Sequence, residues 1–430
     1  MQHPKIFNLE ERVLKISKLR QRFLEIAEKK GTPCYVYDEE ETKKNLQRFQ
    51  AAFQRQNLNA RIFYAVKSNP YPGLLKTVVS EGHGLDVSSQ RELKLALAAN
   101  SKHIIYTGPA KTEDDFLGIL PHRDRITIHL ESLRELHLLS EIARSKKVRM
   151  RCGVRICASA QTGWTKFGIP LGKLREFFEA ARTHEESIDF CGVQFHISMN
   201  KTPQKYVAAL EEIGSYCEAH FSEEERNQFK FLDIGGGFYP EVFEGIYSWN
   251  PEQEMKFFDE GNCQNSILAD TYVPRYTPIH VSPIEEFAAE IAKTLKANIY
   301  PLFKDIALYT EPGRYVSHSS LHILLRLIEI KGYQVGITDG GGNMIGWEKY
   351  QFFNYVPLFN LTQFNPEKET PFLLYGSLCT PDDIWGYYLH GNTPRANDLI
   401  LMPYQGAYTY TLAQEFIHNI PNVQTLRELA

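Results

Sequence analysis

The 430-residue sequence lacks the features that mark several common classes of protein. It has no run of Lys or Arg and a formal net charge of −4, which argues against nucleic acid as a partner. No stretch reaches the roughly 18 apolar residues of a membrane-spanning helix. The first twenty residues carry charges throughout and have no apolar core, so they do not resemble a secretory signal. We therefore expect neither a nucleic-acid partner nor a membrane partner.

Cysteine is sparse and scattered. The seven cysteines include no Cys-x-x-Cys pair and no His/Cys cluster with zinc spacing, so the sequence predicts no metal site. This usage fits a reducing cytoplasm best. Six of the seven are expected to be inert thiols, and only Cys379 lies in a motif of interest.

What is present is the composition of an ordinary globular protein, with 43% hydrophobic and 23% charged residues. From about residue 34 to 315, short β-branched runs alternate with helical patterns such as 90–100, 132–146 and 203–220. Such alternation implies parallel strands with right-handed crossovers. Eight units over roughly 250 residues indicate a closed (β/α)8 TIM-type barrel rather than an open doubly wound sheet. The candidate strands are Arg61–Lys67, Gly84–Val87, Ile104–Thr107, Ile126–Leu130, Val148–Ile156, Cys191–Ile197, Phe229–Ile234 and Ile306–Thr310.

The pattern changes after about residue 316. The segment Leu321–Val335 could be a long strand or a helix. Beyond it, short runs separated by Gly, Pro and aromatic residues predict antiparallel β-structure. These runs are Phe372–Leu374, Asp398–Met402 and Ala407–Thr411.

Two domains follow from this change of pattern. We expect residues 34–316 to form the barrel, and residues 1–33 with 317–430 to form a β-rich domain. The segment Tyr239–His280 is long, aromatic and polar, without clear periodicity. A loop of this length in a compact enzyme is usually a lid or an insertion near the site, and its role stays open.

The ends of the predicted strands carry chemically active groups. Functional residues of a barrel collect at the C-terminal ends of its strands, so these groups should converge on one rim. A lysine, two acids, an imidazole, a triple glycine and an arginine together suit a phosphorylated, electron-poor ring. The groups are Lys67, Asp86, His196, Gly235–Gly237, Glu311 and Arg314.

Each of these groups also has an ordinary structural explanation. A lysine such as Lys67 at a strand end is usually solvated, and Asp86 could cap the helix that begins near Ser88. In isolation His196 would be a hydrogen-bonded core histidine, and Gly235–Gly237 a tight turn. Their joint occurrence at successive strand ends favours a binding site.

Pyridoxal 5′-phosphate (PLP) needs partners of these types. A lysine amine such as that of Lys67 forms an imine with the cofactor. An acid beside the pyridine nitrogen keeps the ring protonated, so that it accepts the electrons released when a bond to Cα breaks. Glu311 is the best-placed acid, and a flat side chain such as His196 can press on the ring face. Backbone amides and an arginine can hold the phosphate.

In the same order along the chain, these motifs resemble those of the fold-type III PLP decarboxylases. This group contains the diaminopimelate, ornithine and arginine decarboxylases and is related to alanine racemase. The resemblance runs from Thr32 to Tyr408 and implies an alanine racemase-like fold, a barrel followed by a mostly antiparallel β domain. The motifs are Tyr64–Pro70, Gly84–Ser89, Phe195–Ser198, Asp233–Gly237, Glu311–Arg314, Cys379 with Asp383, and Gly406–Tyr408.

The resemblance implies a role for each motif. Lys67 would carry PLP, His196 would stack on the ring and Glu311 would pair with the pyridine nitrogen. Cys379 of the partner subunit would protonate Cα after carbon dioxide leaves, which implies a homodimer with shared active sites. The other residues expected at the cofactor are Asp86, Gly236, Gly237, Gly313, Arg314 and Tyr408. Those expected at the small-molecule amino-acid substrate are Arg314, Trp347, Asp383 and Tyr408.

Three departures from the family pattern matter. Residues 196–199 read His-Ile-Ser-Met where the family has His-x-Gly-Ser, so the serine that usually contacts the phosphate is displaced or lost. The other two departures bear on the substrate. No acid directly follows Cys379, and Thr338–Tyr350 contains no Arg. The two groups that grip the distal end of diaminopimelate are therefore missing, and a Trp347/Glu348 pair stands nearby. These patterns resemble the subgroup that decarboxylates amino-acid conjugates, such as citryl amino acids, in siderophore biosynthesis.

Two other functions are open to such a chain. An amino-acid racemase needs a second base on the opposite face, normally a tyrosine, whereas the Cys379 motif favours decarboxylation. A non-catalytic PLP-binding regulator tends to lose the cofactor lysine or the interface cysteine, and this sequence keeps both Lys67 and Cys379.

Overall fold

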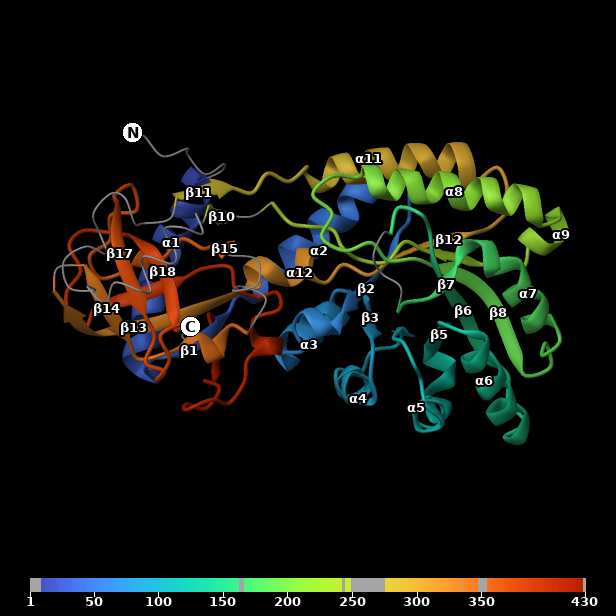
Figure 1. Cartoon of the computed structure of the whole chain (residues 1–430), viewed down its shortest axis with the longest axis horizontal. Coiled ribbons are helices and arrows are strands. Elements are labelled where there is room, and N and C mark those ends of the chain that lie inside the picture. Colours follow the sequence, from blue (N-terminus) through green and yellow to red (C-terminus); the bar gives the residue numbers. More distant parts are fainter. Residues whose placement is uncertain are drawn as a thin grey trace. The chain divides into compact units, whose positions relative to one another are not determined.

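Two units make up the chain (Figure 1). The barrel unit comprises Thr42–Pro240 and Val281–Val316. The β unit comprises Met1–Glu41, Glu241–His280 and Ser317–Ala430. The structure is a computed structural model and describes residues 9–161, 166–241, 244–248, 275–332, 334–346 and 354–427.

Eight parallel strands of the barrel unit close on themselves. Each strand pairs in parallel with its neighbours, and the last, β12, pairs with the first, β2. This confirms the predicted (β/α)8 barrel, and each of the eight predicted strands forms. The strands are β2 (Arg61–Ala65), β3 (Gly84–Val87), β4 (Ile104–Tyr106), β5 (Ile126–Leu130), β6 (Met150–Cys157), β8 (Ile188–Gln194), β9 (Phe231–Asp233) and β12 (Ala307–Thr310). A short strand, β7 (Ile169–Pro170), adds to β6.

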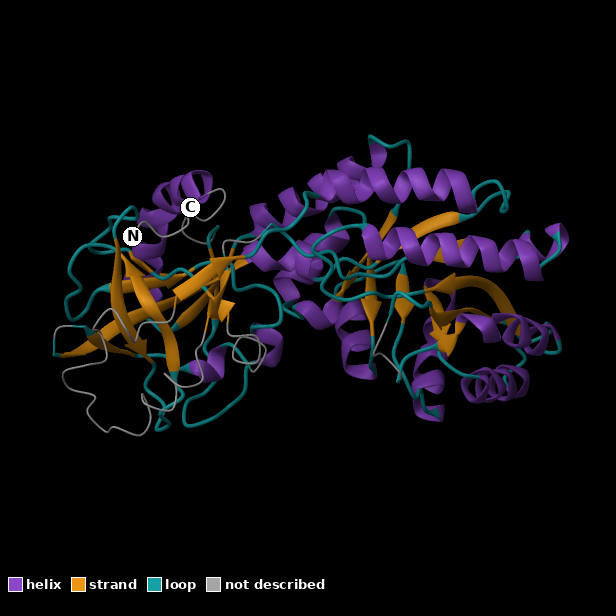
Figure 2. Cartoon of the chain, turned by 45° about the horizontal axis from the view of Figure 1, so that its top comes forward, coloured by secondary structure: helices purple, strands orange, loops and turns teal. Residues whose placement is uncertain are grey.

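Helices cover the outside of these strands (Figure 2). Their starts follow from local sequence: the Ser89 and Ser132 side chains each accept a backbone N–H three residues on, and Thr112 forms a capping box with Asp115. The three helical patterns read from the sequence are confirmed as α4, α6 and α8. The helices are α2 (Glu39–Gln54), α3 (Pro72–Ser80), α4 (Gln90–Ala98), α5 (Glu113–Ile119), α6 (Leu133–Ser145), α7 (Leu174–Arg182), α8 (Gln204–His220), α9 (Glu223–Arg226), α11 (Ile284–Thr294) and α12 (Arg314–Ser317).

Aromatic side chains fill part of the barrel interior. The Phe231 and Tyr309 rings stack with their centroids 4.9 Å apart, and Phe63 lies 5.0 Å from Tyr309. All three are buried. The barrel interior is thus a packed core, and its side chains lie directly below the polar groups at the strand ends.

An eight-stranded, mostly antiparallel sheet forms the β unit. Its order is β14-β17-β18-β16-β19-β13-β1-β20, which confirms the predicted fold class. The segment after residue 320 is a strand, which settles the strand-or-helix alternative. Helix α1 (Leu9–Lys30) belongs to this unit. The strands are β1 (Cys34–Tyr37), β13 (Leu321–Lys331), β14 (Val335–Thr338), β16 (Phe359–Asn360), β17 (Glu369–Tyr375), β18 (Ile384–His390), β19 (Leu399–Met402) and β20 (Val423–Thr425).

The boundary drawn from the sequence at residue 34 differs from the division seen in the structure. Strand β1 pairs antiparallel with β13, with Cys34 opposite Leu324, and so belongs to the sheet of the β unit. A run as short as Cys34–Tyr37 would suit a strand of either sheet. Only its pairing with a strand distant in the sequence shows to which unit it belongs.

Both described ends of the segment Tyr239–His280 contain strands. β10 (Gly245–Ser248) pairs with β11 (Arg275–Pro278) and with β15 (Asn354–Tyr355) in a three-stranded sheet. The rest of the proposed insertion, residues 242–243 and 249–274, lies outside the described residues.

The strand predicted at Ala407–Thr411 is wrong. The chain there makes turns and a single 3-10 turn, η7 (Tyr410–Leu412). Tyr408 has a φ of 57°, a left-handed conformation that a β-strand does not contain.

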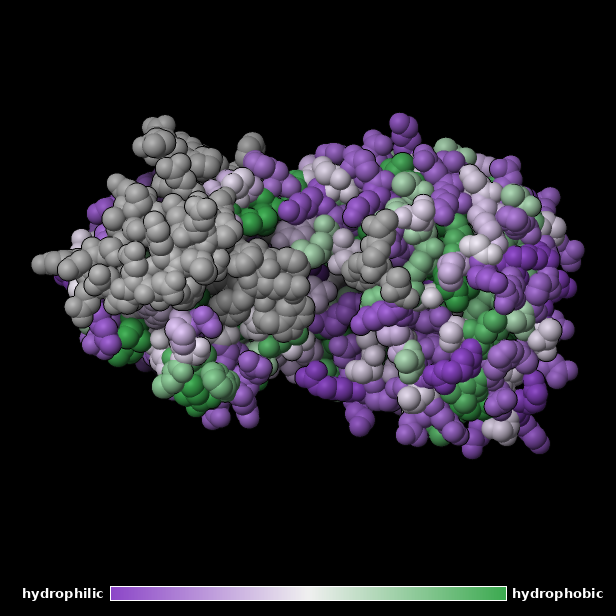
Figure 3. Space-filling view, viewed as in Figure 1, coloured by the Kyte–Doolittle hydropathy of each residue, from purple (hydrophilic) through white to green (hydrophobic). Residues whose placement is uncertain are grey.

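None of the helices in the described residues combines the length and the apolar character needed to cross a membrane. Hydrophilic side chains predominate on the barrel-unit face drawn in Figure 3, with apolar ones scattered among them. Scattered apolar residues are ordinary on a folded surface.

One glycine after β9 is required by the close approach of two loops. Gly237 has a φ of 91°, and a Cβ added there would overlap the Ile197 carbonyl oxygen. We expect Gly237→Ala to lower the free energy of unfolding of the apoprotein by about 4 kcal/mol or more. Gly332→Ala is the matched control, because it has a φ of 64° and nothing within 4 Å. It should cost only about 1 kcal/mol. Equal losses in denaturant unfolding would refute the steric argument.

Candidate active site

Lys67 lies just beyond β2. The strand ends at Ala65, and Lys67 sits in a single 3-10 turn, Val66–Ser68, so the strand predicted through Lys67 is two residues too long. The chain turns there because the Asn69 side chain accepts the backbone N–H of Tyr71 across a proline. The Lys67 side chain is 37% exposed, and its Nζ lies 3.8 Å from Asp86 Oδ2.

Asp86 is a buried carboxyl group inside β3. Neither of its oxygens accepts a hydrogen bond from any residue that the structure describes. Burial, with the nearby Glu311, raises the pKa of Asp86 from 3.8 to about 7. It does not cap the next helix, since Ser89 does so. The group is therefore placed to pair with a cation rather than to hold the backbone.

Two further carboxyl groups share this interior. Glu311 accepts hydrogen bonds from Gln194 Nε2 at 3.3 Å, and Asp233 Oδ1 accepts the Gly235 N–H at 2.8 Å. Burial raises the pKa of Glu311, and burial together with Glu311 raises the pKa of Asp233 well above its usual range. Neighbouring buried acids cannot all ionise without a compensating positive charge.

His129, which the sequence analysis did not single out, lies between two of these acids. Its Nδ1 is 3.8 Å from Glu311 Oε1, and its Nε2 is 4.0 Å from Asp233 Oδ2. Thr107 Oγ1 lies 3.3 Å from Nδ1. Burial lowers the pKa of His129 well below its usual range, so the ring is neutral. It stands one residue before the end of β5, and inspection of that strand end would have found it.

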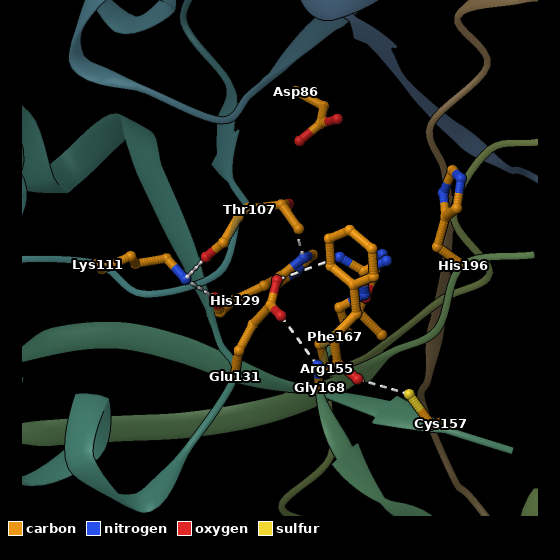
Figure 4. Close-up of polar contacts among 12 residues, drawn as sticks. Asp86, Thr107, Lys111, His129, Glu131, Arg155, Cys157, Phe167, Gly168 and His196 are labelled. Atoms are coloured by element: carbon orange, nitrogen blue, oxygen red, sulfur yellow. Dashed lines mark hydrogen bonds and ion pairs between the residues drawn. The ribbon is translucent and has the colours of Figure 1, made fainter. Parts of the chain in front are cut away.

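Arg155 on β6 was also missed. Its Nη1 lies 3.1 Å from Glu131 Oε1, and its guanidinium lies 4.4 Å from the centre of the Phe167 ring (Figure 4). Glu131 Oε2 also accepts the Gly168 N–H at 2.9 Å. The positive charge of Arg155 opposes the rise in the pKa of Asp86. An arginine within the otherwise apolar stretch of β6 was the signal in the sequence.

His196 lies two residues beyond β8. Its Nδ1 accepts the Gly236 N–H at 3.1 Å and is 3.7 Å from Glu311 Oε2. Burial, with Lys67 and Arg155, lowers the pKa of His196 well below its usual range. The hydrogen bond at Nδ1 then assigns the proton to Nε2. A neutral ring fixed at one nitrogen suits the stacking role proposed for it.

The glycine turn and the arginine lie beside these groups. The N–H groups of Gly235 and Gly236 donate to Asp233 and His196. The guanidinium of Arg314, the first residue of α12, lies 5.1 Å from the centre of the Tyr239 ring. Phosphate contacts by Gly236, Gly237, Gly313 and Arg314 stay predictions.

The other predicted residues belong to the β unit. Cys379 is exposed in the turn between β17 and β18, and Asp383 in the same turn is buried. Tyr408 is half-buried. Trp347 lies outside the described residues.

The barrel residues fit a cofactor with a protonated ring. A primary amine stands beside acids whose ionisation requires a buried positive charge, and the pyridinium of PLP would supply it. Atoms of His129, Asp233 and Glu311 lie within 4.8 Å of one another, close enough for a metal ion, and an organic cation meets the same electrostatic demand.

Comparisons with known proteins show the family of the chain. Residues 39–318 match the family model of the pyridoxal binding domain of pyridoxal-dependent decarboxylases. Diaminopimelate decarboxylase of Methanothermobacter thermautotrophicus is 24% identical over 409 residues, which cover 91% of this chain and 86% of that protein. The 2-[(L-alanin-3-ylcarbamoyl)methyl]-2-hydroxybutanedioate decarboxylase of Staphylococcus aureus is 24% identical over 403 residues, 88% of this chain and 90% of that protein.

A solved structure shares the fold. The crystal structure of diaminopimelate decarboxylase from M. jannaschii in co-complex with L-lysine aligns with a TM-score of 0.75 at 20% identity. The alignment covers 94% of this chain and 89% of that one.

If Lys67 is the cofactor anchor, its removal must abolish the imine. We expect Lys67→Ala to lose both turnover and the absorbance near ~420 nm that a PLP imine gives. Lys76→Ala, an exposed lysine of α3, is the control and should retain both. A Lys67→Ala protein that keeps the absorbance and turnover would end the assignment.

The buried acid predicts a pH dependence of stability. In the folded apoprotein Asp86 keeps a proton that the unfolded chain releases near pH 3.8, so stability falls as pH rises from there to about 7. In Asp86→Asn this fall should be less steep, measured by denaturant unfolding across that range. In the control Asp124→Asn, which changes an exposed residue, the free energy of unfolding should depend on pH as it does in the unchanged protein. Parallel curves for Asp86→Asn and the unchanged protein would contradict the assignment.

Proposed function

The chain belongs to the pyridoxal-dependent decarboxylases, and from that premise we propose that its substrate is an amino-acid conjugate rather than diaminopimelate. Decarboxylation of an amino acid with PLP is the activity of the family. What distinguishes one member from another is how the far end of the substrate is held.

The observation that carries the proposal is the absence of both distal grips. No arginine occurs in Thr338–Tyr350, so no guanidinium from that segment can pair with a distal carboxylate. The residue after Cys379 is Thr380, which cannot pair with a distal ammonium as an acid would. A substrate whose distal end lacks the paired ammonium and carboxylate of diaminopimelate does not need these two groups.

The Staphylococcus aureus relative supports this class of substrate. The substrate in its name joins an L-alanin-3-yl group through an amide to a hydroxybutanedioate, and the relative matches 88% of this chain. A conjugate of diaminopropionate with a citrate-like acid is therefore the compound to test first. Diaminopimelate itself is the second candidate, because the Methanothermobacter thermautotrophicus relative is named for it and is as similar to this chain, at 24% identity, as the Staphylococcus aureus relative.

PLP supplies an electron sink for the pair released when the α-carboxylate leaves. We propose that Lys67 holds the cofactor, and that Glu311 keeps a negative charge at the ring nitrogen. Neutral His196 would press on the ring without adding charge. Asp233, whose pKa is raised by burial, would keep its proton and so leave the charge on Glu311.

We also propose that the protein works as a homodimer in a reducing cytoplasm. The exposed Cys379 would then donate the proton to Cα in the partner's active site. Free thiols at all six described cysteines support the reducing compartment. In this proposal the barrel unit, Thr42–Pro240 with Val281–Val316, holds the cofactor, and the β unit contributes to the interface.

A panel of substrates tests the proposal. Carbon dioxide release should be fastest with a citryl-diaminopropionate conjugate, by about tenfold or more in kcat/KM over meso-diaminopimelate. D- and L-lysine, ornithine and arginine should be slower still. Fastest turnover of meso-diaminopimelate would refute the proposed substrate but leave the family activity intact.

The same panel separates the alternative functions. Loss of optical rotation without carbon dioxide release would indicate a racemase. Absence of both, in protein that carries PLP, would indicate a non-catalytic regulator.

A further inference from the structure

The turn that carries Cys379 is built around one buried carboxylate. Asp383 is 3% exposed, and both its oxygens accept backbone N–H groups. Oδ2 accepts the N–H of Leu378 at 2.7 Å, the residue directly before the cysteine. Oδ1 accepts the N–H of Gly342 at 2.6 Å, from the turn that follows β14. One side chain therefore joins two turns that lie 41 residues apart in the sequence.

Backbone hydrogen bonds close the same turn. The Gly376 N–H donates to the Asp383 carbonyl at 2.8 Å, and the Thr380 N–H donates to the Leu378 carbonyl at 2.9 Å. The Ser377 N–H donates to the Gly340 carbonyl at 3.1 Å, a second link to the neighbouring turn. Only the tip of the turn, with Cys379, is exposed.

The carboxylate fits because a glycine faces it. A Cβ added to Gly376 would overlap Asp383 Oδ2, and one added to Gly341 would lie 3.0 Å from the same oxygen. Gly341 is thus explained by this contact and by Leu378, whose Cγ would lie 2.5 Å from the added Cβ.

A third segment joins the assembly. Asn343 Nδ2 donates to the carbonyls of Gln414 and His418, and the Gln414 N–H donates back to the Asn343 carbonyl at 3.0 Å. Ser377 Oγ lies 3.1 Å from His418 Nε2. Three loops of the β unit are therefore held as one piece, with the cysteine at its surface.

From this geometry we infer that Asp383 is a positioning residue for Cys379 and does not bind substrate. Asp383 is 3% exposed, and each of its carboxylate oxygens accepts a charge-assisted hydrogen bond from a backbone amide, so these hydrogen bonds hold the turns and do not face a substrate. They also fix the backbone at Leu378, the residue directly before Cys379. This inference rests on the proposed role of Cys379 as proton donor.

Three variants test it in the full-length PLP-loaded protein. Asp383→Asn replaces one accepting oxygen with an NH₂ group that faces a backbone donor. Gly376→Ala keeps the carboxylate, but its added Cβ displaces the carboxylate from the position in which it accepts the two N–H groups. This variant replaces Asp383→Asn as the test if Asp383→Asn does not fold. Asp382→Asn, the exposed neighbour, is the matched control and should behave like the unchanged protein.

The first measurement does not depend on activity. Alkylation of Cys379 by iodoacetamide, followed by mass spectrometry of its peptide between pH 6 and pH 10, reports how firmly the turn is held. In Asp383→Asn and Gly376→Ala the rate should move, by about tenfold, towards that of a free peptide of residues 376–383. If the unchanged protein already reacts like the peptide, the inference fails whatever the substrate is.

The second measurement follows the fate of the proton. A proton delivered to Cα gives the amine, whereas one delivered to the cofactor carbon gives, after addition of water, a carbonyl product with the nitrogen left on the cofactor. Asp383→Asn should lower the ratio of amine to carbonyl product, in the same direction as expected for Cys379→Ala, with KM unchanged.

Two results of this measurement would overturn the inference. A raised KM with an unchanged product ratio would make Asp383 a substrate-binding residue. An unchanged KM and an unchanged ratio would leave it a purely structural clamp. If no substrate releases carbon dioxide, the proposed function fails, while the alkylation rates still decide whether Asp383 holds the turn.

Discussion

Buried negative charge at the end of the barrel is the constraint on which the site depends. Asp86 and Glu311 lie in an interior where an ionised carboxyl is costly without a cation. Lys67 is near one of them, and the charge of Arg155 is shared with Glu131. In the proposed function a protonated aromatic ring meets the remaining demand for positive charge. The electrostatics of these residues therefore fit a cationic cofactor before any substrate is considered.

Neutral histidines make this arrangement possible. If His129 or His196 were protonated, either could satisfy Glu311 and remove the need for the ring nitrogen. Burial holds both pKa values well below the usual range, so both rings stay neutral. The two histidines therefore shape the site and fill it without cancelling the charge that the cofactor requires.

Most of the barrel and much of its rim could be predicted from the sequence, because both depend on local signals. Alternation of short apolar runs with helical periodicity located all eight strands, and the strand-end rule located Lys67, Asp86 and Glu311. Long-range pairing could not be predicted: nothing within Cys34–Tyr37 reports that its partner is β13. Likewise, the sequence predicts that Asp383 binds substrate, and only the structure shows that two backbone N–H groups donate to its carboxylate.

Acids with raised pKa values also couple cofactor binding to protons. Without the cofactor, the cluster containing Asp86 retains protons up to about neutral pH, even with Lys67 nearby. A pyridinium placed beside it lowers those pKa values, since opposite charge favours the ionised form. Binding must then release the protons, and by linkage a higher pH favours binding over the range in which the empty cluster is protonated. The same charges that destabilise the apoprotein at neutral pH thus strengthen its hold on the cofactor.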